Sequence, residues 1–104
     1  MKIIHIDNLD YEVVDEFKNA LDEEELKNIF TDYFYTFDYV LGDYSYNKLR
    51  LKGFYKADNK KVQEYNNVDK YKNYLEDFCA SECPYFLLKK QIKSWKNNIN
   101  IIKL

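Results

Sequence analysis

The hydrophobic positions in the first third of the chain change their period, and each change predicts a new element. Residues 2–7 and 9–14 alternate between apolar and polar side chains, which predicts two short strands joined by a tight turn at residues 7–8. From Asp22 to about Thr36 the apolar residues recur every three or four positions, which predicts a helix with one buried face. Asp22 is placed to cap this helix, and the glutamates after it suit the positive end of the helix dipole.

A second pair of strands is predicted after this helix. Residues 37–41 alternate, residues 42–47 supply turn chemistry, and residues 48–55 alternate again as a returning strand. Together they predict a β-hairpin in the middle of the chain. Of its two glycines, Gly42 is interpreted as part of the turn, and Gly53 as a notch that admits a neighbouring side chain on the buried side.

The last part of the chain combines a polar connection, a helix and a strand. Residues 57–67 lack hydrophobic periodicity and predict a loop, whereas residues 68–79 present an apolar face at helical spacing. Pro84 disfavours continuation of that helix, and residues 85–89 are apolar on both faces, as in a central strand. The apolar residues after Lys90 have helical spacing that three asparagines weaken, so a basic tail and a helix both remain open.

The order of the predicted elements is β-β-α-β-β-α-β, followed by the tail. With 104 residues and no low-complexity linker, the chain is long enough for one hydrophobic core and too short for two. We therefore predict a single α+β domain, with a mostly antiparallel sheet covered on one face by two helices. The expected boundaries are residues 1–90 for the domain and residues 91–104 for the C-terminal basic tail or helix.

Charge and hydropathy exclude several classes of function. The formal net charge of −2 and the isoelectric point near 5.4 are unlike those of general polyanion-binding domains, which are strongly basic. No apolar run is long enough for a membrane helix, and the N-terminus lacks the features of a signal peptide, so the cytoplasm is the expected location. The sequence identifies neither a partner nor an oligomeric state.

One face of the predicted hairpin combines cations with aromatic rings. The only arginine and both glycines of the chain lie between residues 42 and 53. On the returning strand, alternation places the cations opposite the leucines and Gly53. The candidate binding residues on this face are Tyr46, Lys48, Arg50, Lys52 and Phe54, and extending the alternation adds Tyr44. Rings that stack and cations that meet anions are typical of a surface that contacts RNA or an acidic protein.

In this hypothesis Arg50 makes a two-pronged contact, because its guanidinium offers a planar fork of donors that lysine lacks. The lysines add an attraction that salt screens. The simpler alternative is a solvated sheet face, on which the cations pair with acids of neighbouring strands, such as Asp10, Glu12 and Asp38. An Arg50 side chain tied to an internal acid would count against the contact with a partner.

Two longer segments carry a resemblance to a known family. The first runs from Gly42 to Tyr55, and the second runs from Tyr74 to Lys90 and places two cysteines before an aromatic-aliphatic strand. These segments resemble the YutD-like family of small bacterial proteins. With the Tyr-Glu-Val-Val strand near the N-terminus, the resemblance covers about residues 9–90 and leaves the tail outside. It implies a compact α/β or α+β domain and brings no reaction, ligand or catalytic residue.

The two cysteines are a second candidate site. Cys79 and Cys83 could form a reversible disulfide or supply half of a metal site, and the simpler interpretation is that both are small apolar residues of the core. A structural zinc needs four ligands, and His5 is the single histidine, so no metal is expected. A thiol-based redox or metal-linked regulator is therefore an alternative to the binding module.

Catalysis is the remaining alternative. The chain has no P-loop, nucleophile elbow or dinucleotide fingerprint, so neither a cofactor nor a catalytic residue is expected. An enzyme acting on a phosphorylated small molecule at residues 42–46, with Asp43 as base, stays open. We therefore favour a non-enzymatic binding module.

Overall fold

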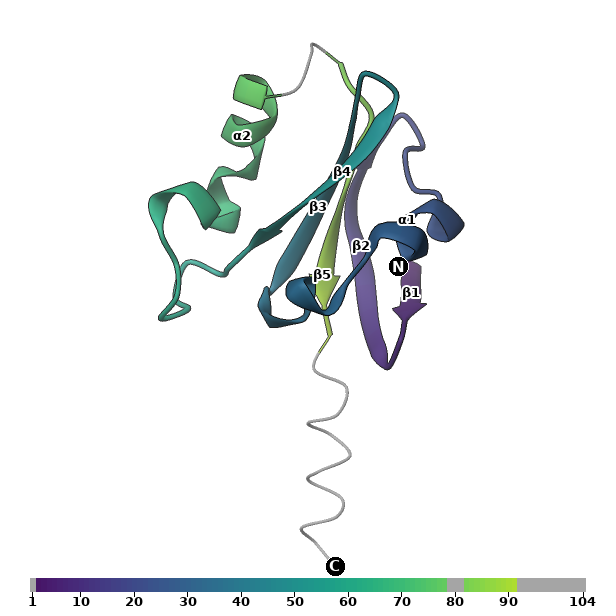
Figure 1. Ribbon diagram of the computed structural model, residues 1–104. Coiled ribbons are helices and arrows are strands. Elements are labelled where there is room, and N and C mark those ends of the chain that lie inside the picture. The colour runs from purple at the N-terminus through teal and green to yellow at the C-terminus, as the bar shows by residue number, and fades with distance from the viewer. Residues whose placement is uncertain (1, 79–81, 92–104) are drawn as a thin grey trace, which may run out of the picture.

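The computed structural model describes residues 2–78 and 82–91, in which a five-stranded sheet carries two α-helices (Figure 1). The strands are β1 (Lys2–Ile6), β2 (Leu9–Phe17), β3 (Tyr39–Ser45), β4 (Lys48–Phe54) and β5 (Tyr85–Lys90). The helices are α1 (Glu23–Ile29) and α2 (Tyr71–Phe78), with 3₁₀ turns η1 (Asp32–Thr36), η2 (Glu64–Asn66) and η3 (Val68–Lys70). This order confirms the α+β class and the predicted succession of elements.

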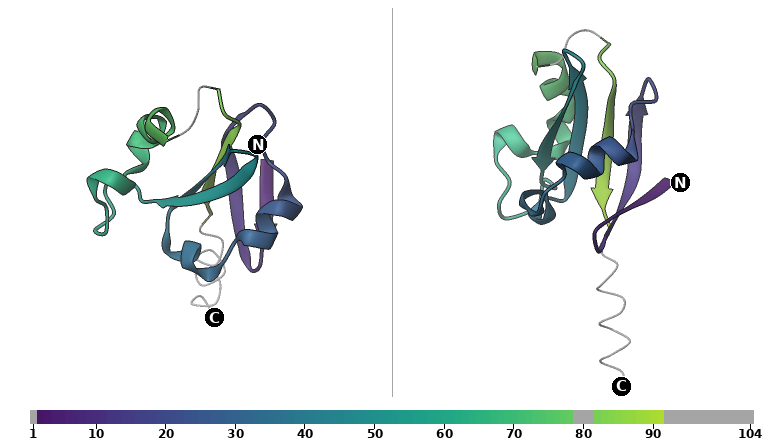
Figure 2. Two further views of the ribbon diagram at one scale, coloured as in Figure 1. Left: turned by 45° about the horizontal axis from the view of Figure 1, so that its top comes forward. Right: turned by 45° about the vertical axis from the view of Figure 1, so that its right-hand side comes forward.

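The strands lie in the order β1-β2-β5-β3-β4, and every strand pair is antiparallel (Figure 2). β5 lies between β2 and β3, which confirms that the strand with two apolar faces is central. β1 and β4 form the two edges of the sheet. β2 is longer than predicted, because it continues past an irregularity between Val13 and Asp15 as far as Phe17.

The two helices lie on opposite faces of the sheet, and the expectation that both cover one face is wrong. Leu26 of α1 belongs to one cluster of buried side chains and Leu75 of α2 to the other. Consecutive strand residues divide between the clusters as pleating requires, for example Val40 toward α1 and Leu41 toward α2. The physical reason is the composition of β5, because a strand that is apolar on both sides needs cover on both sides.

The β3–β4 hairpin is tighter than predicted. Its loop is only Tyr46–Asn47, and both residues have positive φ, 54° and 62°, as in the type I′ turns that match the twist of paired strands. Gly42 is therefore a strand residue and not part of the turn: a Cβ atom there would lie 2.2 Å from Cζ of Phe86. Gly53 is a packing notch as predicted, because a Cβ atom there would lie 2.3 Å from Cγ of Phe37.

The first helix begins as predicted and ends early. Oδ1 of Asp22 accepts hydrogen bonds from the backbone N–H groups of Glu24 and Glu25, each at 3.1 Å, which satisfies two donors that the first turn leaves free. α1 ends at Ile29, and η1 then carries the chain to Thr36 in place of further α-helical turns. The acidic run is therefore accounted for by capping.

The second helix is shorter than its apolar pattern. η3 occupies its first residues, so α-helical geometry begins at Tyr71 and not at Val68. In the part of the chain that the structure describes, no helix is both long and apolar enough to cross a membrane. The predicted tail or helix covers residues 91–104, of which all but residue 91 lie outside the described residues, so the proposed domain boundary stays a prediction.

Candidate functional site

The predicted binding residues occupy several environments. Tyr46 stands at the tip of the hairpin with 99% of its surface exposed, and Lys48 is exposed beside it. Phe54 is only 1% exposed, because α2 covers this end of the sheet and the ring of Tyr74 packs edge-on against it at 5.9 Å. The sheet face predicted to be open is therefore closed by α2 at one end, and Phe54 is a core residue.

Tyr44 lies on the opposite face, toward α1. The two-residue turn pairs Tyr44 with Leu49, so alternation does not continue unchanged from one strand to the other. The Tyr44 hydroxyl donates a hydrogen bond to the Glu25 carboxylate. Burial and this hydrogen bond raise the pKa of Tyr44 to about 12. Tyr44 thus fastens α1 to the sheet and is not a ligand-stacking ring.

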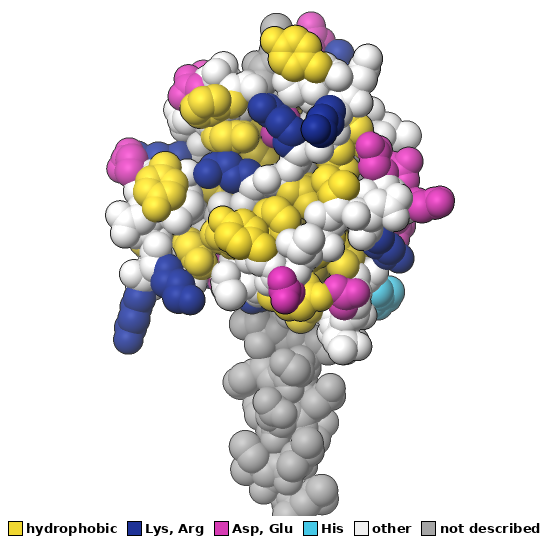
Figure 3. Space-filling model, viewed as in Figure 1, with side chains coloured by type: hydrophobic (Ala, Val, Ile, Leu, Met, Phe, Trp, Pro, Cys, Tyr) yellow, Lys and Arg dark blue, Asp and Glu magenta, His cyan; other side chains and the backbone are white. Residues whose placement is uncertain are grey.

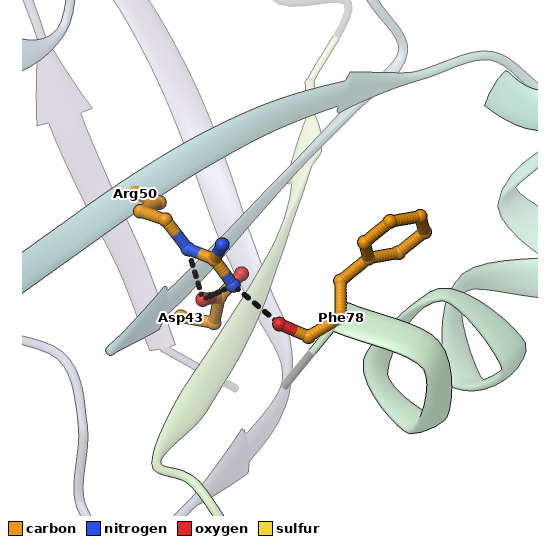
Figure 4. A network of polar contacts seen from close by, with 3 residues as sticks. All are labelled: Asp43, Arg50 and Phe78. Atoms are coloured by element: carbon orange, nitrogen blue, oxygen red, sulfur yellow. Dashed lines mark hydrogen bonds and ion pairs between the residues drawn. The ribbon is translucent and has the colours of Figure 1, made fainter. Parts of the chain in front are cut away.

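Arg50 is tied to groups of its own chain (Figure 4). Its Nε and Nη2 both donate to Oδ1 of Asp43, at 2.9 and 2.7 Å, and Nη2 also donates to the backbone oxygen of Phe78 at 3.0 Å. The side chain of Asp43 is 1% exposed and that of Arg50 is 38% exposed. The hydrogen bond to Asp43 raises the pKa of Arg50, against the effect of burial. Arg50 joins β3, β4 and the end of α2, which counts against the predicted contact with a partner.

Lys52 has a contrasting environment. Its Nζ lies 5.2, 5.4 and 5.7 Å from the ring centres of Phe54, Tyr74 and Tyr65, within the range of cation–π attraction. Among residues 2–78 and 82–91, no carboxylate lies within 4.0 Å of this amine. Burial lowers the pKa of Lys52. The described structure therefore surrounds this cation with rings and gives it no ion pair, although Glu64 and Asp77 line the same hollow.

Lys52 and Tyr65 also separate two hollows in the surface. One, of about 690 Å³, runs beside β4 between η1 and the segment that leads to η2. The other, of about 380 Å³, lies between β4 and α2. Hydrophobic side chains with lysine and arginine among them gather on the face that carries β4 (Figure 3). We name six of the aromatic and basic residues that line the two hollows the β4 surface: Tyr33, Lys52, Lys61, Tyr65, Tyr74 and Phe78. Asp32, Glu64 and Asp77 also line the hollows.

A polar cluster fastens the first residues of α2 to strands β2 and β5. Oδ2 of Asp15 accepts hydrogen bonds from the hydroxyls of Tyr71 and Tyr85, at 2.6 and 3.0 Å, and Lys72 Nζ lies 3.4 Å from the same oxygen. Burial alone would raise the pKa of Asp15, but these hydrogen bonds and the charge of Lys72 hold it below its ordinary value. Burial and the bond to Asp15 raise the pKa of Tyr71 to about 12. The cluster acts as an anchor.

The structure gives little support to the enzyme and metal candidates, and it does not describe both cysteines. Asp43, the base of the enzyme alternative, is buried against Arg50 in a strand. Within the described ranges, no three His, Cys, Asp or Glu side chains come together as a metal site. Cys79 lies outside the described residues, so the disulfide or metal role of Cys79 and Cys83 stays a prediction.

Two of the three rings around Lys52, those of Tyr65 and Tyr74, were not predicted from the sequence. Tyr65 belongs to a connection that was predicted as a plain polar loop. Its side chain is 71% exposed, and its ring nevertheless lies close to the amine of Lys52. Tyr74 and the exposed Phe78 come from α2, which was placed on the wrong face. The available signal was Tyr65 itself, a single aromatic residue in an otherwise polar segment.

Comparison with known proteins identifies the family. Residues 5–89 match the family model described as "Putative antitoxin YutD-like". The chain belongs to the YutD-like family. The resemblance found in the hairpin and around the cysteines is thereby confirmed, and the match begins a few residues earlier than that resemblance.

A sequence match and a structure match, both to YutD of Bacillus subtilis, support this membership. The chain is 35% identical over 88 residues to "Putative antitoxin YutD" of Bacillus subtilis (strain 168), which is 85% of this chain and 97% of that protein. The solution NMR structure of yutD from B. subtilis is similar with a TM-score of 0.75 and 34% identity, covering 89% of this chain and 84% of that one. The α+β fold is therefore shared with a solved structure of the family.

Proposed function

We propose that this YutD-like protein is a non-enzymatic binding module whose β4 surface recognises an acidic surface of a partner protein. Lys52 is the observation that carries the proposal: a half-buried amine under three rings, with no carboxylate within 4.0 Å among the described residues. A carboxylate of the partner would supply the missing charge, and the exposed rings of Tyr65 and Phe78 would supply apolar contact. Aromatic residues of this kind dominate the energetics of protein interfaces.

The environments of the cations favour a protein over RNA as the partner. Arg50, the side chain best suited to grip a phosphate, spends its donors on Asp43 and Phe78. The formal net charge of −2 opposes a polyanion over the rest of the surface. One partly buried lysine among rings suits a single carboxylate better than a row of phosphates.

The names of the relatives support the same class of function. The B. subtilis protein is described as a putative antitoxin, and in its simplest form an antitoxin acts by binding a toxin and masking it. Binding of that kind needs a surface and no catalytic group. We therefore extend the proposal: the partner is harmful when free, and binding at the β4 surface neutralises it.

Site-specific crosslinking tests this proposal. A photoreactive amino acid replaces the exposed Tyr65 on the β4 surface or, as a control, Ile3 on the opposite edge strand. We expect irradiated native cells to yield a protein adduct at position 65, resistant to ribonuclease and absent at position 3. The captured protein, expressed alone, is expected to slow growth, and co-expression with the YutD-like protein is expected to restore it.

Three outcomes would contradict the proposal. An adduct that ribonuclease destroys would assign the β4 surface to RNA. Equal adducts at positions 65 and 3 would remove the surface specificity. A captured protein that is harmless when expressed alone would be consistent with a binding module but would contradict the proposal that binding neutralises a harmful partner.

A further inference from the structure

The backbone of the edge strand β4 has hydrogen-bonding groups directed away from the sheet. The loop Tyr46–Asn47 makes Ser45 and Lys48 the closing pair, and such pairs exchange backbone hydrogen bonds. Hydrogen-bonded pairs alternate with non-hydrogen-bonded pairs, so Lys48, Arg50 and Lys52 bond to β3. The residues between and after them, Leu49, Leu51 and Gly53, direct their backbone groups away from β3. The hydrogen bond from Tyr44 N to Pro84 O agrees with this register, because it directs Tyr44 toward β5.

The protein already uses this edge for strand pairing at one position. Tyr55, the next residue in the outward series, donates its N–H to Asn66 O at 2.7 Å, and its carbonyl oxygen accepts from Val68 N at 2.9 Å. Tyr55 and Asn67 thus form a parallel bridge just beyond the end of β4. Beyond the strand ladder, no hydrogen bond within residues 2–78 and 82–91 reaches Leu49, Leu51 or Gly53.

The larger hollow of the β4 surface runs along this unpaired edge. Leu51 and Gly53 line it, together with aromatic residues of η1 on one side and Tyr65 on the other. Its volume of about 690 Å³ lies within the range of pockets that hold peptide-like or drug-sized ligands. The edge therefore offers free backbone groups and side-chain pockets together, the combination by which sheets bind extended peptides.

Charge selects among the possible occupants of this edge. β4 carries Lys48, Arg50 and Lys52 and no acid, so a second copy of β4 would bring cations against cations. The chain's own residues 92–104 carry three lysines and no acid, which disfavours them in the same way. Edge lysines are a common protection against self-association. An acidic segment from another protein is the occupant that the charges favour.

We propose that β4 accepts an extended segment of a partner protein as a sixth strand, with a carboxylate side chain of that segment seated at Lys52. The backbone of Lys52 faces β3, so the residue opposite it on an antiparallel added strand forms a non-hydrogen-bonded pair, the pair in which side chains approach most closely. This inference rests on the proposed function, because it takes the partner to be an acidic protein. It adds the mode of binding and the chemistry of the segment.

A random peptide library displayed on phage, selected against the full chain, tests the site without the cellular partner. We expect acidic peptides, with hydrogen exchange slowed at the Leu49, Leu51 and Gly53 amides and unchanged in β1. Peptides N-methylated at every second amide are expected to lose binding in one frame and keep it in the other, because only one set of amides pairs with β4. Two matched variants carry the same change of charge. We expect about tenfold weaker binding for Lys52→Glu and unchanged binding for Lys60→Glu, which lies on the exposed loop.

Lys52→Gln provides a second variant, and amide NMR spectra establish that each variant folds. Strand addition is rejected if both N-methylated frames bind, if Lys52→Glu and Lys60→Glu behave alike, if β4 shows no slowed exchange, or if no peptide is selected. Protection of β4 that rises with protein concentration and needs no peptide would assign the edge to a second copy. A protein crosslink at position 65 without strand pairing would keep the proposed function and reject strand addition. Strand pairing with peptides, but no protein crosslink at position 65, would keep β4 as a peptide-binding edge and reject the proposed function.

Discussion

The two faces of the sheet are stabilised in different ways. On the α1 face, the larger of the two clusters of buried apolar side chains joins α1 to all five strands, and Phe86 packs against the bare backbone of Gly42. On the α2 face the apolar cluster is smaller, and α2 is held at both ends by polar ties, one through Asp43 and Arg50 and the other through Asp15. The face with fewer apolar contacts is the one that keeps Lys52 near solvent.

This difference separates residues that maintain the fold from residues that are available to a partner. Arg50 and Lys52 are two positions apart on one strand and point the same way, yet Arg50 is engaged by an internal acid and Lys52 by rings alone. Charge by itself therefore does not identify a binding residue. A binding residue is identified by whether the protein already supplies its charge with an internal partner.

The largest expected effect comes from breaking the Arg50 tie. Arg50→Met leaves the buried Asp43 carboxylate without its counter-charge. We expect the free energy of unfolding to fall by about 3 kcal/mol, at the low end for a broken buried pair because Arg50 is 38% exposed. Urea unfolding measures it, with Lys48→Met as the exposed control. A loss below about 1 kcal/mol, typical of a surface ion pair, would contradict the structural role.

A methyl group added on the α1 face should cost somewhat less. Gly42→Ala places a Cβ atom 2.2 Å from a ring that is completely buried, so Phe86 or the strand must shift. We expect a loss of about 2 kcal/mol in the free energy of unfolding. Gly53→Ala is the matched variant, with a smaller loss, because Phe37 lines the larger hollow and has room to move. An equal or larger loss in Gly53→Ala would overturn this difference.

The Asp15 anchor predicts a dependence on pH. The pKa of Asp15 is lowered in the folded protein, so its contribution is present above the ordinary value of about 3.9 and is lost as pH falls through the folded value. Tyr71→Phe removes one hydrogen bond to this carboxylate, and we expect about 1.5 kcal/mol lower stability near neutral pH. The deficit should shrink in acid. A deficit that stays constant from pH 7 to about pH 2 would show that Asp15 is not its source.

The smallest expected effect is on the α1 face. Among the described residues, the Tyr11 hydroxyl is buried without a hydrogen-bond partner. Tyr11→Phe removes an unsatisfied group, so stability should stay within about 0.5 kcal/mol of the wild type or rise slightly. Burial raises the pKa of Tyr11 to about 12, so an ultraviolet titration of the variant should lack one ionisation near that pH. A loss above about 1 kcal/mol would mean that the hydroxyl has a partner, such as an internal water.

Sequence patterns predicted the features that depend on neighbours in the chain. The cap at Asp22, the central position of β5 and the notch at Gly53 all follow from local composition and alternation. The placement of Gly42 failed because the length of the turn was overestimated. Tyr44 was placed on the wrong face for another reason: the alternation of the returning strand was extended through the turn, whereas residues paired across the turn, such as Tyr44 and Leu49, share a face.

Features that depend on distant contacts were beyond the sequence. Arg50 meets Asp43 only in one hairpin register, and it meets Phe78 only because α2 returns to this face. The rings around Lys52 come from β4, η2 and α2, three elements whose mutual packing no local pattern records. The lysine was found as a candidate, and the reason for choosing it over Arg50 came from the fold.

The most direct test of the central claim is the affinity of the partner captured at position 65 for three purified proteins. Calorimetry on the wild type, Lys52→Glu and Lys60→Glu compares the same change of charge inside and outside the β4 surface. The account predicts about tenfold weaker binding for Lys52→Glu and unchanged binding for Lys60→Glu. Equal affinities for the two variants would contradict the assignment of Lys52 as the residue that meets the partner's carboxylate.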